Sequence, residues 1–299
     1  MTAMAENTPQ KQSSSSSNFA GTFLTVANSI FVILALGWCS LVGMLPLLLV
    51  SGFVHDLTYY PLYLAALALS TPGIAALFAV FRDQPTLFSG NSALRAKVWQ
   101  DHADEKDFPP DWIAQPYVDP NHNAAVIKPY FRAYARVFKR SLAMGFTFAV
   151  LAFCFLYNMQ IFAQLPFGVY VTPMLAVCLV FLAQALLIAL VLVVEYPKAK
   201  WLVTLKNAVM LSVRRFYMIV VSGIVLAAFG FALVTWSPIL FLLLGTGVVG
   251  YMLWASARWQ ADKLFVLMAN ESKDKRIIDM YSAQSRGNNF FNAQSDWQQ

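Results

Sequence analysis

Charged residues are scarce in this chain. Asp, Glu, Lys and Arg make up only 12% of its 299 residues, and 59% of the residues are hydrophobic. Soluble domains usually contain about 25% charged and roughly 45–50% apolar residues, so this composition excludes an ordinary soluble fold. The chain is therefore predicted to be a polytopic membrane protein.

Cysteine and histidine are also few, with three residues of each type. The cysteines lie inside apolar runs and lack the paired spacing of disulfide frameworks or zinc sites, so we interpret them as packing residues: Cys39, Cys154 and Cys178. His102 and His122 lie in a charged loop without a histidine pair at i, i+4. His55 and Asp56 are interpreted as a link at headgroup level. We expect no metal site.

The middle of each apolar run lacks ionisable residues, which usually mark ion or proton pathways in membranes. Glu195 lies at the end of a run, and the polar residues within runs are Ser40, Thr147 and Gln184. This absence argues against a transporter coupled to protons or sodium. An uncoupled path stays open as an alternative. Such a path would use Gln184 and the predicted kink formed by Thr71, Pro72 and Gly73. The other interpretation of these three residues is a packed kink without a path.

Catalytic and nucleotide-binding patterns are missing as well. Gly245 to Gly250 matches GxGxxG, with Glu271 about twenty residues further on. However, the match lies within an apolar run and follows no predicted strand, so we interpret its glycines as helix-packing residues. There is no GxxxxGK[ST] loop and no nucleophile, metal or acid–base pair. We expect a protein that is not an enzyme, with no cofactor.

Apolar runs dominate what is present, and the ranges are 23–53, 59–81, 142–165, 169–194, 216–236 and 239–257. A membrane span needs about 20 apolar residues, so each run can form one. The first run is longer than needed and is predicted to bend at Pro46. The sequence thus predicts an all-α polytopic bundle of six spans arranged as three hairpins.

The positive charges lie on one side of this predicted topology. Of the 21 Lys and Arg residues, one is Lys11, nine lie in 82–140, five in 198–215 and six after residue 257. The links near His55, Pro166 and Ser237 carry none. Since positive residues favour the cytoplasmic side, both termini are predicted to be cytoplasmic, in a bacterial plasma membrane. The net charge of +6 fits this topology better than it fits nucleic-acid binding.

Two segments next to predicted spans are basic and amphipathic, and each is predicted to form a helix in the membrane interface. The first, 129–142, precedes the third span. Its apolar residues, expected to face acyl chains, are Tyr130, Phe131, Tyr134, Val137 and Phe138, and its basic residues are Arg132, Arg136, Lys139 and Arg140. The second, 198–215, precedes the fifth span and carries Lys206, Arg214 and Arg215. We expect these basic residues to bind an anionic inner leaflet or a protein partner.

The chain is predicted to divide into a disordered tail, 1–18, a membrane domain, 19–286, and a mobile tail, 287–299. The membrane domain contains a loop, 82–141. Within this loop a short helix is predicted from a cap at Asn91 or Ser92 to Trp99. The rest is expected to be irregular but ordered, because it has apolar residues to bury: Phe108, Trp112, Ile113 and Tyr117.

Three stretches together resemble the YesL-like family of bacterial membrane proteins, which is catalogued as a domain of unknown function. They are Ser70 to Arg82, Tyr130 to Leu142 and Leu205 to Ser212. The chain departs from the family pattern by Thr-Pro-Gly where Gly-Pro is usual, and by its long loop. The resemblance implies an accessory role in sugar uptake, with subunits of an ABC importer as partners.

The leading hypothesis is accordingly a non-enzymatic accessory or scaffold subunit that docks through its basic cytosolic face. The alternative is a stand-alone, uncoupled solute permease.

Overall fold

The computed structural model describes residues 14–84, 87, 90–102, 105, 110–118 and 126–288, and these residues form helices without any strand. Six of the described helices are long and apolar enough to cross a membrane. The prediction of an all-α membrane protein with six such helices is confirmed. The six helices are α1 (Ser14–Gly43), α3 (Tyr60–Asp83), α5 (Ile127–Phe162), α6 (Gly168–Glu195), α8 (Tyr217–Thr235) and α9 (Pro238–Ser272).

Five shorter helices complete the described chain: α2 (Leu45–Phe53), the 3-10 helix η1 (Leu57–Tyr59), α4 (Gly90–Asp101), α7 (Trp201–Arg214) and α10 (Lys275–Asn288). The predicted short helix of the loop is α4, which begins at Gly90 instead of Asn91 or Ser92. The break between α1 and α2 falls at Met44, with a proline in the first turn of α2. The bend expected at Pro46 is therefore present, since proline is tolerated at a helix start but not within one.

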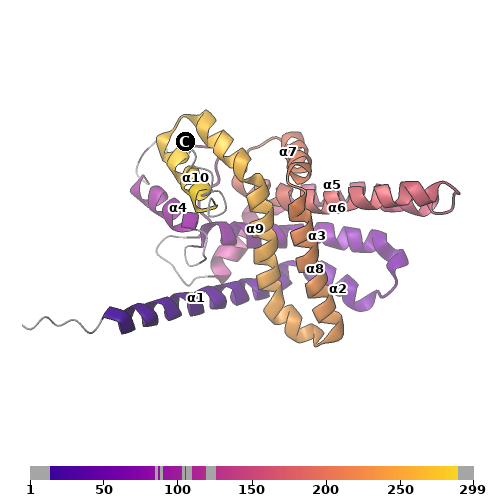
Figure 1. The fold of residues 1–299 in the computed structure, drawn as a ribbon, viewed down its shortest axis with the longest axis horizontal. Coiled ribbons are helices and arrows are strands. Elements are labelled where there is room, and N and C mark those ends of the chain that lie inside the picture. The colour runs from indigo at the N-terminus through magenta and orange to yellow at the C-terminus, as the bar shows by residue number, and fades with distance from the viewer. Residues whose placement is uncertain are drawn as a thin grey trace, which may run out of the picture.

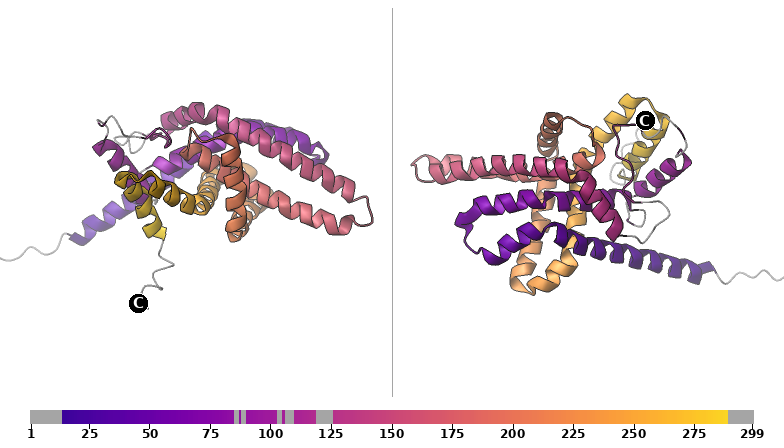
Figure 2. Two further views of the ribbon diagram at one scale, coloured as in Figure 1. Left: turned by 90° about the horizontal axis from the view of Figure 1, so that it is seen from above. Right: turned by 180° about the vertical axis from the view of Figure 1, so that it is seen from behind.

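The long helices follow two directions. The axes of helices α1, α3, α5 and α6 lie roughly along one line of direction, and the α8–α9 pair crosses them (Figure 1). The view from behind shows the same crossing (Figure 2). Helices α4 and α10 lie side by side near the ends of α3 and α6. We call this region, with the beginning of α5, α7 and residues 110–118, the charged end, because Arg136 and Arg140 of α5 contact Tyr117 and Tyr196 there. That this end is cytoplasmic remains a prediction.

Glycine residues permit a close crossing of helices α1 and α9. A Cβ atom on Gly37 of α1 would lie 2.7 Å from the backbone nitrogen of Gly247 in α9, so neither position has room for a larger side chain. At the same crossing Trp38 donates a hydrogen bond from Nε1 to the carbonyl of Leu243, at 2.9 Å. Gly250 packs against Leu77 of α3. These contacts agree with the interpretation of the GxGxxG match as helix packing.

The first basic amphipathic segment differs from its prediction. It is the beginning of α5, a continuous helix of 36 residues, and not a separate helix before the span. Tyr130 and Val137, expected to face acyl chains, are buried within the protein, whereas Phe131 is 45% exposed. The reason is that α5 packs along α3 with a stripe at four-residue spacing, which includes Ala133 and Ser141.

The second segment forms α7, which packs on α6. Its buried residues are small, namely Thr204, Ala208 and Ser212, apart from one leucine. Its large apolar residues face outward, and Leu202 and Met210 are 66% and 60% exposed. Only two residues separate α7 from α8, so α7 directly precedes a membrane-length helix in the chain.

Several predicted boundaries also move. Residues 14–18, assigned to a disordered tail, are helical, while 1–13 lie outside the described residues. The sixth apolar helix continues past 257 to Ser272, and α10 includes positions 287 and 288 of the expected mobile tail. Residues 289–299, like Phe108, lie outside the described part of the chain.

Candidate functional site

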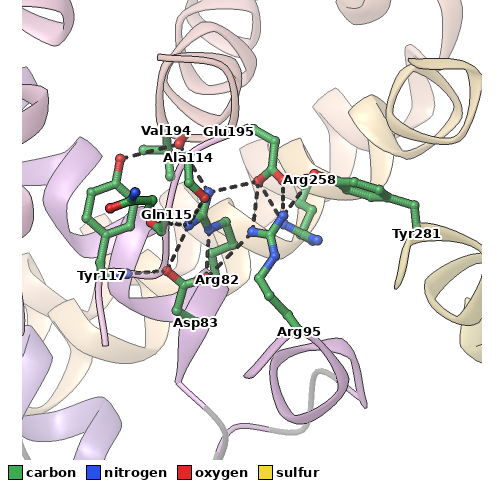
Figure 3. Close-up of polar contacts among 10 residues, drawn as sticks. All are labelled: Arg82, Asp83, Arg95, Ala114, Gln115, Tyr117, Val194, Glu195, Arg258 and Tyr281. Atoms are coloured by element: carbon green, nitrogen blue, oxygen red, sulfur yellow. Dashed lines mark hydrogen bonds and ion pairs between the residues drawn. The ribbon is translucent and has the colours of Figure 1, made fainter. Parts of the chain in front are cut away.

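Six buried residues from five helices meet at the charged end (Figure 3). Helix α3 ends on an Arg–Asp pair, α6 ends on a glutamate, α4 and α9 each supply an arginine, and α10 supplies a tyrosine. Each of the six residues is at most 9% exposed. We call this group the ion cluster, and its members are Arg82, Asp83, Arg95, Glu195, Arg258 and Tyr281.

Glu195 is the acceptor at the centre of the ion cluster, and its side chain is fully buried. Its Oε2 atom lies 3.3 Å from Nη1 of Arg82 and 3.9 Å from Nη1 of Arg258. Its Oε1 atom accepts hydrogen bonds from Arg95 and from the hydroxyl of Tyr281. One carboxylate therefore links helices α3, α4, α9 and α10 to the end of α6.

Asp83 is the second carboxylate of the ion cluster. It accepts two hydrogen bonds from Arg82, each 2.8 Å long, in the two-pronged geometry that guanidinium and carboxylate groups favour. Arg95 lies 3.6 Å away. Asp83 also accepts a hydrogen bond from the backbone N–H of Tyr117, at 2.8 Å. It thus connects the end of α3 to the irregular segment.

Residues 110–118 close over the ion cluster. Arg82 donates from Nη2 to the carbonyls of Ala114 and Gln115, at 3.4 and 3.3 Å. The backbone N–H of Ala114 donates to the carbonyl of Glu195, at 3.0 Å. Ile113 and Tyr117 are only 3% and 1% exposed, so the expectation that this part of the loop buries apolar residues is confirmed.

Burial makes the charges of the ion cluster interdependent. Three arginines face two carboxylates, and charges this deep are stable only when they are paired. Burial lowers the pKa of Arg95, but Glu195, Tyr281 and Asp83 outweigh that effect, and the net pKa is raised. Burial and the neighbouring Glu195 raise the pKa of Tyr281, so its hydroxyl stays protonated and can donate. The paired charges therefore connect five helices at the charged end.

A depression of about 290 Å³ adjoins the ion cluster. It is lined by the 110–117 segment, Arg136 of α5, and Pro197 and Lys198 after α6. The guanidinium of Arg136 lies over the ring of Tyr117, 5.0 Å from its centre, and Arg82 of the ion cluster lies over the same ring at the same distance. Tyr117 therefore joins the depression to the ion cluster.

The structure separates the predicted basic residues into two groups. Arg132, Arg136, Lys139, Lys206 and Arg214 are exposed at the surface. Arg140 instead donates to the carbonyls of Tyr196, at 3.0 Å, and Ala199. Arg215 donates to the carbonyl of Trp259 and lies 4.0 Å from the centre of its ring. These last two arginines join helices.

The residues proposed for an uncoupled path are packed. Thr71, Pro72 and Gly73 are fully or nearly fully buried. Pro72 has no N–H to offer the carbonyl of Ala68, and the hydroxyl of Thr71 lies 2.7 Å from that carbonyl as its donor. The Tyr130 hydroxyl donates to the carbonyl of Gly73, at 3.2 Å.

Gln184, the other residue of the proposed path, donates to Oε1 of Gln260 in α9, at 2.7 Å. Gln260 in turn donates to the carbonyl of Arg215, at 2.9 Å. The two amides thus complete a buried chain of hydrogen bonds between α6, α9 and the start of α8.

Of the two histidines considered as ligands, only His102 belongs to the described residues. His102 lies 2.7 Å from a carboxylate oxygen of Glu105, and His122 lies outside the described residues. The described part of the chain contains no group of three or more His, Cys, Asp or Glu side chains that could hold a metal ion.

The ion cluster was not predicted from the sequence. In the sequence its members lie at span ends, in the loop 82–141 or, for Tyr281, after the last span, so no local pattern joins them. A signal was nevertheless available, because Arg82, Asp83, Glu195 and Arg258 all lie at the ends of predicted apolar runs. Opposite charges at the same predicted depth indicate pairing.

Comparisons of the chain with protein-family models, with curated proteins and with solved structures give no match.

Proposed function

We propose that this multi-pass membrane protein is a non-enzymatic accessory or scaffold subunit that docks a protein partner at its charged end. The proposal includes the orientation of the protein, with the charged end on the cytoplasmic side of a bacterial membrane. The partner is a subunit of an ABC-type carbohydrate importer, a choice supported by the resemblance of three sequence stretches to the YesL-like family.

The main observation behind the proposal is that the charges of the ion cluster are paired with one another inside the protein. Glu195 and Asp83 form their ion pairs and hydrogen bonds with groups of the same chain. These contacts connect α4, α10 and the 110–118 segment to the ends of α3 and α6. A rigid charged end results, whose outer surface carries exposed basic residues such as Arg132 and Lys139. Preorganised surfaces of this kind favour docking, because little ordering entropy is lost on binding.

The packing of the spans supports this proposal over the permease alternative. Thr71, Gly73 and Gln184 have hydrogen-bond partners inside the protein and are buried. A solute path through them would require these bonds to open. A buried polar group left without a partner costs about 1–3 kcal/mol, which opposes such opening.

Purification in mild detergent, followed by identification of the co-purifying proteins, tests the proposal. We expect a stoichiometric importer subunit with the wild-type protein, and its loss in Arg132→Glu and Lys139→Glu with membrane insertion unchanged. Lys263→Glu is the matched control, because Lys263 is also exposed but lies on α9.

Two results would contradict the proposal. One is a complex that survives both substitutions on α5. The other is a monodisperse protein, purified without partner, that moves a sugar across liposomes at a rate well above empty vesicles, which would favour the permease.

A further inference from the structure

We infer that the depression beside Tyr117 binds the phosphate of an anionic phospholipid headgroup, with Arg136 as the main contact and Lys198 as the second. This site is independent of the protein partner proposed above. It rests on the position, size and charge of the depression.

The depression lies at the level where apolar helices end. Lys198 is three residues after Glu195, the last residue of α6. Arg136 lies six residues before Leu142, where the apolar run of α5 begins, a separation of about 9 Å along a helix. Headgroups occupy the zone immediately outside the hydrocarbon, roughly 5–7 Å deep on each side of a bilayer. The backbone of Arg136 thus lies just beyond this zone, and its long side chain, like that of Lys198, can extend to a lipid phosphate.

The size of the depression suits a headgroup. Its volume of about 290 Å³ is near the lower end of small-molecule sites, which range from roughly 300 to 1,000 Å³. The depression therefore has room for a group the size of a headgroup phosphate.

Arg136 is suited to phosphate because its guanidinium is already positioned. It lies over the Tyr117 ring at 5.0 Å, and Tyr117 is itself fixed by the hydrogen bond from its N–H to Asp83. A planar guanidinium binds phosphate oxygens with two parallel hydrogen bonds, and positioning it beforehand reduces the entropy lost on binding.

Lys198 forms an ion pair with Asp111, and a phosphate can take the place of this carboxylate. Its Nζ lies 2.7 Å from Asp111, but the two side chains are 63% and 89% exposed. An exposed pair of this kind contributes only about 0–1 kcal/mol, so a phosphate can replace the carboxylate at little cost.

The test uses full-length protein in vesicles of phosphatidylcholine with a minor share of phosphatidylglycerol. After extraction in mild detergent and washing, the retained lipid is quantified by mass spectrometry. We expect wild type to retain phosphatidylglycerol in preference to phosphatidylcholine. Loss of one charge-assisted contact should weaken that retention about tenfold in Arg136→Gln.

Lys139→Gln is the control, because it removes the same charge from the same helix outside the depression, and we expect less than a twofold change. Arg136→Lys keeps the charge without the planar fork and should give an intermediate result. Wild-type protein without preference for phosphatidylglycerol would overturn the inference, as would equal losses in Arg136→Gln and Lys139→Gln. Complete displacement of the retained lipid by inorganic phosphate would instead identify a site for free phosphate.

Discussion

Substitution of Glu195 by Gln tests whether the ion cluster holds the charged end together. Gln has nearly the same shape as Glu, so packing at the end of α6 is preserved while the negative charge is lost. Three buried arginines would then face Asp83 alone, and the contacts of Glu195 with Arg82 and Arg95 would lose their ionic component.

The expected magnitude follows from the burial of Glu195, whose side chain is 0% exposed. Removing one member of a buried ion pair destabilises a protein by about 3–5 kcal/mol, because the remaining charge is left buried without compensation. Each 1.4 kcal/mol corresponds to a factor of ten, so the detached state of α4 and α10 should become about 100 to 4,000 times more populated. The loss falls on these helices because Arg95 and Tyr281 contact Glu195 directly.

Thiol labelling measures this detachment. Ile277 of α10 is 1% exposed, and Ile277→Cys can be labelled only when α10 separates from the bundle. The background replaces the three native cysteines by alanine. We expect labelling to accelerate about 10²-fold or more when Glu195→Gln is added, provided that α10 closes faster than the reagent reacts.

Asp111→Asn is the matched control, because it also removes a carboxylate from an ion pair, but from one at the surface. Such a pair contributes about 0–1 kcal/mol, so labelling should change less than about fivefold. Equal labelling rates in Glu195→Gln and Asp111→Asn would refute the assignment of a holding role to the ion cluster.

Three further predictions concern the crossing of α1 and α9, the pH dependence of α10 and the topology. Gly247→Leu should prevent assembly, because a side chain there would collide with the backbone of Ile33, and size-exclusion profiles should show loss of the monodisperse protein, whereas Gly223→Leu, at an open position, should be tolerated. Because the pKa of Tyr281 is raised above its usual value of about 10, its contribution to stability is complete below pH ~10 and is lost as pH rises further. The melting temperature of wild type should therefore fall more steeply in alkali than that of Tyr281→Phe, and parallel curves would contradict this. Asp56→Cys should react with a membrane-impermeant thiol reagent from outside whole cells, and labelling only after lysis would overturn the topology.

The sequence alone determined the class of the protein and the approximate extent of its helices. A backbone in lipid must satisfy its own hydrogen bonds, so an apolar run of about 20 residues has essentially one outcome, a helix. The same local logic located the bend near Pro46 and the short helix α4. Each of these predictions depends on neighbouring residues only.

The sequence could not show which helix faces contact lipid and which pack against other helices. Tyr130 and Val137 belong to an apolar face that suits acyl chains equally well, and only the packing of α5 on α3 shows that protein covers them. Likewise, Thr71 and Gln184 have the residue types of a polar path, but their partners Ser141 and Gln260 are distant in sequence.

The ion cluster is the clearest case of a feature decided by tertiary structure. Arg82 and Glu195 are 113 positions apart, and Arg95 and Tyr281 are 186 positions apart, so no local pattern joins them. The sequence determined that Arg82, Asp83, Glu195 and Arg258 lie at the ends of apolar runs, because charges are excluded from the hydrocarbon. Which charges meet depends on how α3, α6 and α9 cross, and the crossing of α3 with α9 includes the close contact of Gly250 with Leu77. Burial then makes their pairing obligatory, because an unpaired charge at that depth would be unstable.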